Sequence, residues 1–219
     1  MAKPAKDADP KPPVRLYLVT PPLTEAAAFA APLEAALVGG DVAAVLLRLA
    51  GHDERGLINC IKTLAPVVQG RDAALIVDGH ADLVARAGAD GAHLTGVDAF
   101  GEALERLKPD RIAGCGGLAS RHEAMLAAET GADYVMFGEP NAHGGRPAFD
   151  QVEERVAWWA EVFQVPCVAY AASLDEVGPL TAAGADFIAL GDFIWREPER
   201  TTELVAAAMR LLDVAETAA

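Results

Sequence analysis

Hydrophobic residues recur along the chain in short runs that alternate with longer segments of mixed polarity. The first run covers residues 15–20, and apolar residues then recur at helical spacing over residues 24–38. Further apolar runs fall at about residues 41–49, 73–78, 90–94, 110–114, 132–138, 166–170 and 185–190. Each run and the segment after it take about 25 residues. The pattern predicts eight strand–helix units in succession.

A short internal repeat supports this organisation. The tripeptide Gly-Ala-Asp begins at Gly88, Gly131 and Gly184, each time after an Ala-rich segment and before an apolar run. A glycine there takes the left-handed conformation that ends a helix, and the next two residues turn into a strand. Uninterrupted apolar runs at 134–137 and 187–190 are typical of parallel strands buried on both faces. Eight such units predict an α/β protein that is a single (β/α)8 TIM barrel.

The predicted domain organisation is one barrel with an N-terminal extension. Residues 1–14 are rich in Pro, Lys and Asp and lack apolar periodicity, which predicts a flexible tail. The barrel domain is expected over residues 15–215. Cys60, Cys115 and Cys167 lie far apart in the sequence, which favours reduced thiols over a disulfide framework.

Composition and charge narrow the classes of partner. The chain has 219 residues, of which 52% are hydrophobic and 23% charged, as in a folded domain. A formal net charge of −14 argues against a general nucleic-acid or anionic-membrane binder, because such proteins need a cationic surface. No apolar run approaches the roughly 18 to 20 residues that span a bilayer. We expect a cytoplasmic protein without nucleic-acid or membrane partners, and the sequence leaves a homo-oligomer open.

The residues that follow the predicted strands are the candidates for function, because a TIM barrel carries its active site at the carboxyl ends of its strands. Arg48 follows an apolar run and is suited to clamp a phosphate or carboxylate; the alternative is a strand-end Arg paired with a neighbouring Asp. Asp78 ends the next run, where it is either a functional carboxylate or a helix N-cap.

The segment 93–98 combines a histidine with a carboxylate at the same predicted rim. His93 is suited to hydrogen-bond an anion, and Asp98 to bind Mg²⁺ through oxygen. The alternative makes Asp98 the N-cap of a helix over residues 99–107. Both interpretations stay open.

The segment 138–147 is long for a connection between a strand and a helix. It combines glycines with His143 and Arg146, which favours a loop that folds over a ligand, although an exposed turn has the same composition. Trp158 and Trp159 fall in the following helix, where we expect Trp158 to pack and Trp159 to be partly exposed. Three further rim residues are predicted to bind ligand because they follow strands: Thr95, Gly116 and Gly191.

The segment 114–119 matches the pattern G-x-G-x-x-A of a dinucleotide-binding turn, with Glu139 as a candidate ribose-binding acid. A Rossmann domain that started there would leave four earlier strand–helix units of the same period without a role. An NAD-dependent enzyme is therefore a weak alternative.

The order of these motifs resembles a known family. From about residue 15 to 205, the segments 16–20, 75–78, 88–94, 131–138 and 183–186 are similar to the strand motifs of thiamine-phosphate synthase and its TenI-like relatives. The resemblance implies a barrel that joins hydroxymethylpyrimidine diphosphate to a thiazole phosphate with Mg²⁺, losing pyrophosphate through a carbocation-like step. It implies that Arg48 holds the pyrophosphate, His93 supports it and Asp98 binds the metal. Arg146 falls where the family has a phosphate-binding Lys.

The chain also departs from the family pattern. Leu46 stands in place of an amide, Ala50 in place of a cation and Gly79 in place of a metal carboxylate. Gly116 with Gly117 replaces a Ser-bearing turn, and Ala171 with Ala172 replaces a Gly-Gly phosphate turn. Leu118 with Ala119 replaces the TenI histidine. We therefore expect a family barrel that binds a small phosphorylated metabolite, with Arg48 and His93 as catalytic residues. Asp78 and Asp98 would bind Mg²⁺, and synthase turnover would be slow or absent. The alternative is a non-catalytic barrel that senses or carries a thiamine-related metabolite.

Overall fold

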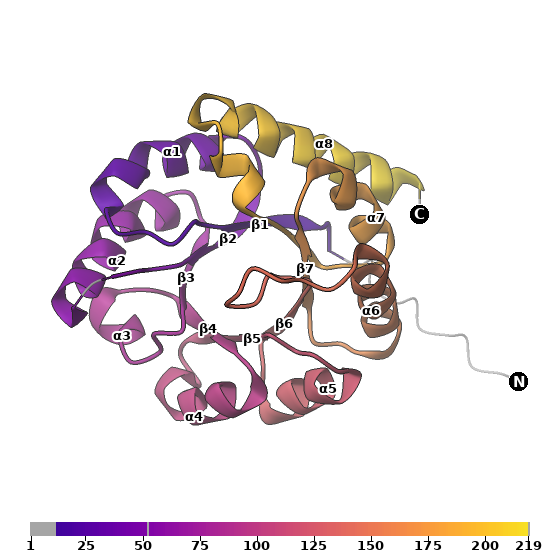
Figure 1. Cartoon of the computed structure of the whole chain (residues 1–219), viewed down its shortest axis with the longest axis horizontal. Coiled ribbons are helices and arrows are strands. Elements are labelled where there is room, and N and C mark those ends of the chain that lie inside the picture. The colour runs from indigo at the N-terminus through magenta and orange to yellow at the C-terminus, as the bar shows by residue number, and fades with distance from the viewer. Residues whose placement is uncertain (1–11, 52, 219) are drawn as a thin grey trace, which may run out of the picture.

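A closed ring of eight parallel strands forms the centre of the molecule (Figure 1). The computed structural model describes residues 12–51 and 53–218. The strands are β1 (Arg15–Val19), β2 (Val42–Leu47), β3 (Ala74–Asp78), β4 (Gly91–Thr95), β5 (Ile112–Gly116), β6 (Tyr134–Phe137), β7 (Cys167–Ala171) and β8 (Phe187–Leu190). Each of them overlaps one of the predicted apolar runs, so the (β/α)8 prediction is confirmed.

Helices cover the outside of this ring (Figure 1). They are α1 (Ala26–Val38), α2 (Glu54–Gln69), α3 (Val84–Ala87), α4 (Val97–Leu107), α5 (Arg121–Thr130), α6 (Phe149–Val162), α7 (Val177–Ala182) and α8 (Thr201–Ala218), with short 3-10 helices η1 (Leu174–Glu176), η2 (Asp192–Trp195) and η3 (Pro198–Arg200). None of these described helices is long and apolar enough to cross a membrane. The first eleven residues of the predicted tail, 1–14, lie outside the described residues.

Because all eight strands are parallel, their carboxyl ends all lie at one mouth of the barrel. Each strand pairs with the next, and β8 pairs with β1 through Tyr17 opposite Ala189. The connection between β6 and α6, which follows the carboxyl end of β6, crosses this ring in Figure 1. The residues that follow the strands therefore surround one opening.

Alternation along the strands separates two layers of core. Leu16 and Leu18 face the helices, whereas Tyr17 faces the barrel axis. Inward side chains fill the axis with Tyr17, Val19, Leu46, Ile76, Tyr134, Met136, Val168 and Tyr170. A cavity of about 400 Å³ remains at the opposite mouth, where Ala44 and Ala74 are too small to fill the space.

The Gly-Ala-Asp repeat has the predicted backbone role and a second one. Gly88, Gly131 and Gly184 have φ of 80°, 112° and 96°, so all three are left-handed. The aspartates then tie each turn to the preceding strand. The Oδ2 atoms of Asp90, Asp133 and Asp186 accept the backbone N–H of Leu75, Ala113 and Cys167 at 2.7, 2.7 and 2.8 Å.

The tryptophan prediction is wrong in its order. Trp159 is fully buried, and its Nε1 donates to the Val165 carbonyl at 2.7 Å, whereas Trp158 is partly exposed beneath the Arg121 guanidinium. Helical periodicity allowed either neighbour to face the barrel, and the satisfied indole N–H identifies Trp159 as the inner one.

Candidate active site

Arg48 lies directly after β2 and is fixed by three contacts. Its backbone N–H donates to Thr20 Oγ1 at 3.0 Å, its Nε donates to the Thr20 carbonyl at 2.6 Å, and one Nη donates to Asp192 Oδ1 at 2.7 Å. The pairing with an Asp that sequence analysis left as an alternative is therefore present. A guanidinium has five N–H donors, so these contacts leave donors for an anion. Thr20 and Asp192 therefore hold the guanidinium in one orientation, and Asp192 neutralises part of its charge.

Asp78 ends β3 close to Arg48. Burial raises the pKa of this carboxyl, and the nearby Arg48 and His80 act in the opposite direction. The N-cap alternative is wrong, because α3 begins only at Val84, with Leu83 at its N-cap. Asp78 is therefore a half-buried carboxyl at the mouth of the barrel, available to a ligand.

His93 lies inside the barrel rather than on its rim. It is only 3% exposed, its Nδ1 is 3.0 Å from the Tyr134 hydroxyl, and that hydroxyl is 2.9 Å from the Tyr17 hydroxyl. Burial lowers the pKa of His93 to about 4. At neutral pH His93 is therefore a neutral hydrogen-bonding group, and it would bond an anion as an N–H donor without adding positive charge.

Glu139, assigned in the sequence only to the weak dinucleotide alternative, belongs to the same centre. Its Oε1 accepts the backbone N–H of Gly117, and burial raises the pKa of its carboxyl. A Cβ at Gly116 would lie 2.5 Å from both Glu139 Oε1 and His93 Nε2, so these two atoms are at most twice that distance apart. The position of Glu139 after the apolar strand β6 was the signal for it. Because a long loop begins at Glu139, the sequence did not show that its side chain points inward.

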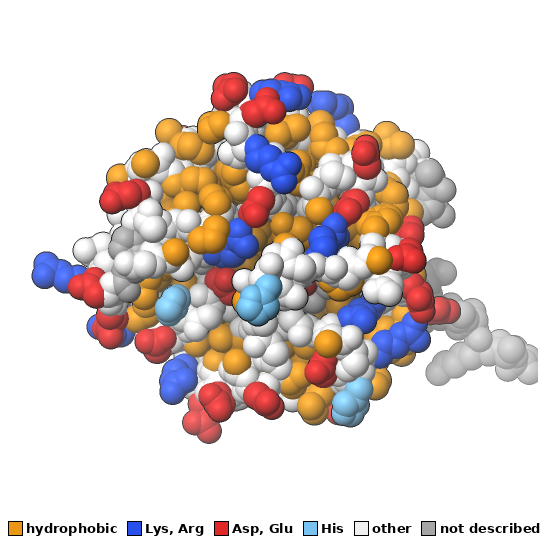
Figure 2. All heavy atoms as spheres, viewed as in Figure 1, with side chains coloured by type: hydrophobic (Ala, Val, Ile, Leu, Met, Phe, Trp, Pro, Cys, Tyr) orange, Lys and Arg blue, Asp and Glu red, His pale blue; other side chains and the backbone are white. Residues whose placement is uncertain are grey.

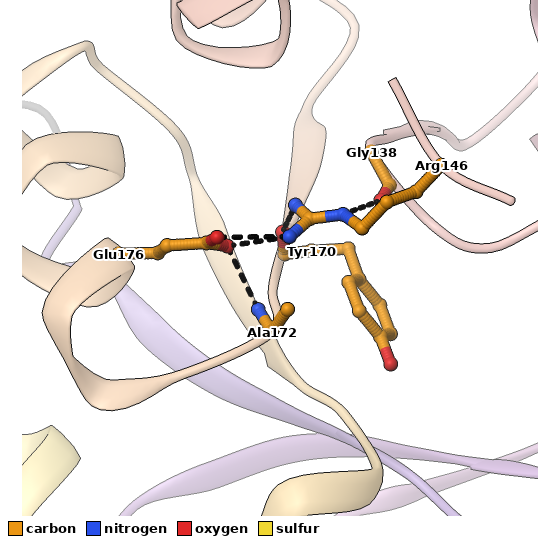
Figure 3. Close-up of polar contacts among 5 residues, drawn as sticks. All are labelled: Gly138, Arg146, Tyr170, Ala172 and Glu176. Atoms are coloured by element: carbon orange, nitrogen blue, oxygen red, sulfur yellow. Dashed lines mark hydrogen bonds and ion pairs between the residues drawn. The ribbon is translucent and has the colours of Figure 1, made fainter. Parts of the chain in front are cut away.

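Arg146 anchors the β6–α6 loop to the barrel. Its Nε donates to the Gly138 carbonyl at 3.1 Å, one Nη to the Tyr170 carbonyl at 3.2 Å, and the other to both Glu176 oxygens at 2.8 and 3.0 Å (Figure 3). Glu176 also accepts the backbone N–H of Ala172 at 2.8 Å. The predicted anion-binding cation is thus already paired with a carboxylate.

Both arginines nevertheless lie on one rim. Burial and the Asp192 carboxylate raise the pKa of Tyr170, whereas the Asp192 N–H, Arg48 and Arg146 act to lower it. Figure 2, drawn from the same side as Figure 1, shows basic and acidic side chains next to one another around the centre of this face. The site therefore combines paired cations with two partly buried carboxyls, Asp78 and Glu139.

The other predicted residues divide into two groups. Gly116 and Gly191 are buried in the site, and a side chain at Gly191 would collide with the Tyr170 hydroxyl. The side chains of Thr95, His143 and Asp98 are exposed to solvent. Asp98 does not cap its helix either, because Gly96 is the N-cap of α4. The strand ends were predictable, whereas the direction of each side chain beyond them was not.

The residues present fit Mg²⁺ only as an ion shared with a ligand. No group of three or more His, Cys, Asp or Glu side chains suited to a metal occurs in the described part of the chain. Mg²⁺ commonly uses one or two carboxylates together with substrate phosphates and water, and the half-buried Asp78 provides such a carboxylate.

The dinucleotide interpretation is wrong. Its glycines lie in and after β5 of a closed barrel, so they do not form the crevice of an open sheet. Gly114 instead makes room for the Tyr134 ring, and Gly117 takes a φ of 66° in the turn that donates to Glu139.

A closed barrel with polar groups gathered at the carboxyl ends of the strands places this chain among the (β/α)8 proteins, in which the active site lies at that mouth. The family model for thiamine monophosphate synthase matches residues 16–194. A thiamine-phosphate synthase from Rhodospirillum centenum is 41% identical over 201 residues, which cover 90% of this chain and 97% of that protein. Another from Hyphomonas neptunium is 36% identical and covers 91% of this chain and 94% of its own. The chain belongs to the thiamine monophosphate synthase family.

A solved structure shows the same architecture. Thiamine phosphate pyrophosphorylase from Pyrococcus furiosus aligns with a TM-score of 0.76 and 22% identity, covering 92% of this chain and 96% of that one. At this identity the likeness establishes the shared fold alone.

Proposed function

We propose that this protein is a thiamine-phosphate-synthase-type transferase that joins a pyrimidine diphosphate to a thiazole phosphate and releases pyrophosphate. The observation that carries the proposal is Arg48, held at the mouth of the barrel by Thr20 and Asp192 with guanidinium donors left for an anion. The extent of the similarity to the Rhodospirillum centenum synthase supports it, because almost the whole of both chains is aligned.

The side chains of the site divide the work of this reaction. Arg48 binds the diphosphate and stabilises the charge that develops as pyrophosphate departs. His93 orients the ligand as a neutral hydrogen-bonding group, and its Nδ1 is fixed by the Tyr134 hydroxyl. The β6–α6 loop, held by Arg146, excludes water from the reacting centre. Mg²⁺ supplies further charge neutralisation when bound, and Asp78 and Asp98 would hold it.

We expect this reaction to be slower than in a member with the full motif set. Ala50 and Gly79 replace a cation and a metal carboxylate, and Glu176 neutralises Arg146. A charge-assisted hydrogen bond contributes about 1.5–3 kcal/mol, and a tenfold change in rate corresponds to about 1.4 kcal/mol. Losses at two or three positions therefore lower turnover by several orders of magnitude.

Steady-state kinetics with the purified chain, both precursors and Mg²⁺ tests the proposal. We expect measurable synthesis of thiamine phosphate with kcat below about 1 s⁻¹, and a loss of about tenfold or more in kcat/KM in Arg48→Ala, partly recovered in Arg48→Lys. No product at any precursor concentration would contradict the transferase proposal. A kcat above that value would contradict the expected impairment.

One observation favours a second candidate, a barrel that carries or senses a thiamine-related metabolite. Both Arg48 and Arg146 are already paired with carboxylates, and these pairs favour retention of a ligand less charged than a diphosphate. Tight binding of thiamine phosphate without turnover of its precursors would identify this function.

A further inference from the structure

Glu139 stands apart from the other carboxylates at the mouth of the barrel. Asp192 and Glu176 each pair with an arginine, whereas none of the ion pairs among the described residues includes Glu139. The positive charge of Arg155 lowers the pKa of Glu139, but its guanidinium donates at 2.6 and 3.1 Å to the Leu118 and Ala119 carbonyls. The Glu139 carboxyl is therefore partly buried and takes part in no ion pair among the described residues.

This carboxyl lines a pocket of about 350 Å³ that has apolar walls. Leu118 and Met136 line the same pocket, as do Arg146 and Arg155. Apolar walls interrupted by a few polar groups are suited to a flat ring whose edge meets one of those groups. Of the two arginines, Arg146 pairs with Glu176, whereas Arg155 donates to the Leu118 and Ala119 carbonyls.

A second polar atom lies beside the carboxyl. His93 Nε2 and Glu139 Oε1 are both 2.5 Å from the position of a Cβ at Gly116, so glycine alone leaves room for the two groups together. His93 Nδ1 is bonded to the Tyr134 hydroxyl, which leaves Nε2 as the ring nitrogen beside Glu139. Glu139 Oε1 accepts from Gly117, and the backbone N–H of Glu139 itself also donates to the carboxyl. The Glu139 carboxyl and His93 Nε2 thus lie next to one another at Gly116.

We propose that Glu139 recognises the amino edge of a heterocycle, in which an exocyclic amino group adjoins a weakly basic ring nitrogen. This inference rests on the proposed function, since it assigns the pyrimidine half of the reaction to this pocket. The carboxylate accepts from the exocyclic amino group and shares a proton with the ring nitrogen. An oxo-substituted ring has no basic nitrogen there and turns its carbonyl oxygen toward the carboxylate. Burial raises the pKa of Glu139, which favours sharing of that proton.

Equilibrium binding measures this preference without turnover. The probes are an unphosphorylated 4-aminopyrimidine and the matching 4-oxopyrimidine, titrated calorimetrically into the full chain. We expect the wild-type protein to bind the amino form about tenfold more tightly, which is the effect of one charge-assisted hydrogen bond. Glu139→Gln keeps an acceptor for Gly117, but its amide can turn either a donor or an acceptor to the ring. The preference should therefore fall below about threefold in this variant.

Two further variants separate recognition from structural support. Glu139→Leu should lose about tenfold in affinity for the amino probe. Glu105→Gln, a change of an exposed carboxylate on α4, should leave the preference as in the wild type. Equal wild-type affinity for both probes, no binding of the amino probe at millimolar concentration, or a preference kept by Glu139→Gln would each overturn the inference.

The binding preference and the formation of product can succeed or fail independently of one another. A tenfold preference in a chain that makes no product supports Glu139 and contradicts the transferase. Product formation without the preference supports the transferase and contradicts Glu139.

Discussion

Arg146 shows how one side chain at the mouth of the barrel serves both packing and charge. It joins the ends of β6 and β7 through two carbonyls, and it pairs with Glu176 while both side chains are mostly buried. A buried pair of this kind costs desolvation energy that the attraction of the two charges offsets only in good geometry. Here the second bond from Ala172 to Glu176 completes that geometry.

Removing the charge of Glu176 should make Arg146 available to anions. We expect Glu176→Gln to bind inorganic pyrophosphate about threefold to tenfold more tightly, because the arginine loses its counter-charge while the amide oxygen still accepts from Ala172. Calorimetric titration measures this change. Glu154→Gln, which alters an exposed pair with Arg121, is the matched control and should show no gain. Unchanged affinity in Glu176→Gln would place Arg146 outside the anion site.

His93 should make the fold sensitive to acid. Burial lowers its folded-state pKa to about 4 from an unfolded value of 6.5, so its contribution is present above pH 6.5 and is lost as the pH falls toward 4. The loss amounts to at most about 3 kcal/mol. The raised pKa values of Asp78 and Glu139 act in the opposite sense, because protonation at low pH favours the folded state at these sites.

Denaturant unfolding at several pH values isolates the histidine. Between pH 6.5 and 4, the unfolding free energy of His93→Gln should fall less than that of the wild type. Parallel curves for the two proteins would show that His93 does not titrate differently on unfolding.

At the scale of elements, the aspartates of the Gly-Ala-Asp repeat connect each strand to the turn after the next helix. Asp90 accepts from Leu75 at the start of β3, and from Gln69 at the end of α2. Asp90→Ala leaves the Leu75 N–H without this partner, and we expect a loss of about 1–3 kcal/mol in unfolding free energy. Asp90→Asn retains an acceptor and should lose less. Asp110→Ala, an exposed change, should lie within about 0.5 kcal/mol of the wild type.

The order of elements was predictable because parallel strands are buried on both faces and read as apolar runs. The three left-handed glycines were predictable for a related reason, since few other residues end a helix in that conformation. The aspartates' bonds were not, because their partners start a strand about 15 to 20 residues earlier. Glu139 and Arg146 show the same limit, since loop geometry decided where each pointed.

At the scale of the whole molecule, the two mouths of the barrel are filled differently. The carboxyl-end mouth is crossed by the β6–α6 loop, whereas the opposite mouth keeps the cavity beside Ala44 and Ala74. Barrel interiors are normally packed by layers of large branched side chains. Better packing at this open mouth would therefore stabilise the fold, and the change would lie far from the candidate active site.

Filling this cavity should stabilise the protein. Ala74→Val adds two buried carbons on a strand, and we expect a gain of about 1 kcal/mol, or about 2–4 °C in Tm, with unchanged ligand binding. Ala92→Val places the same side chain at a fully buried site outside the cavity and should destabilise by about 1–3 kcal/mol. A lower Tm in Ala74→Val would show that the cavity does not admit the added methyl groups.

The short helix η2 connects Arg48 to Trp195, whose fluorescence can report on the site. Asp192 at its start holds the guanidinium, and Trp195 at its end donates from Nε1 to the Val19 carbonyl at 2.7 Å while packing on Phe29. The chain has three tryptophans, so phenylalanine at 158 and 159 leaves Trp195 as the sole indole. An anion that draws Arg48 from Asp192 would then disturb the surroundings of that indole, and ligand capture becomes visible as a shift in its fluorescence emission.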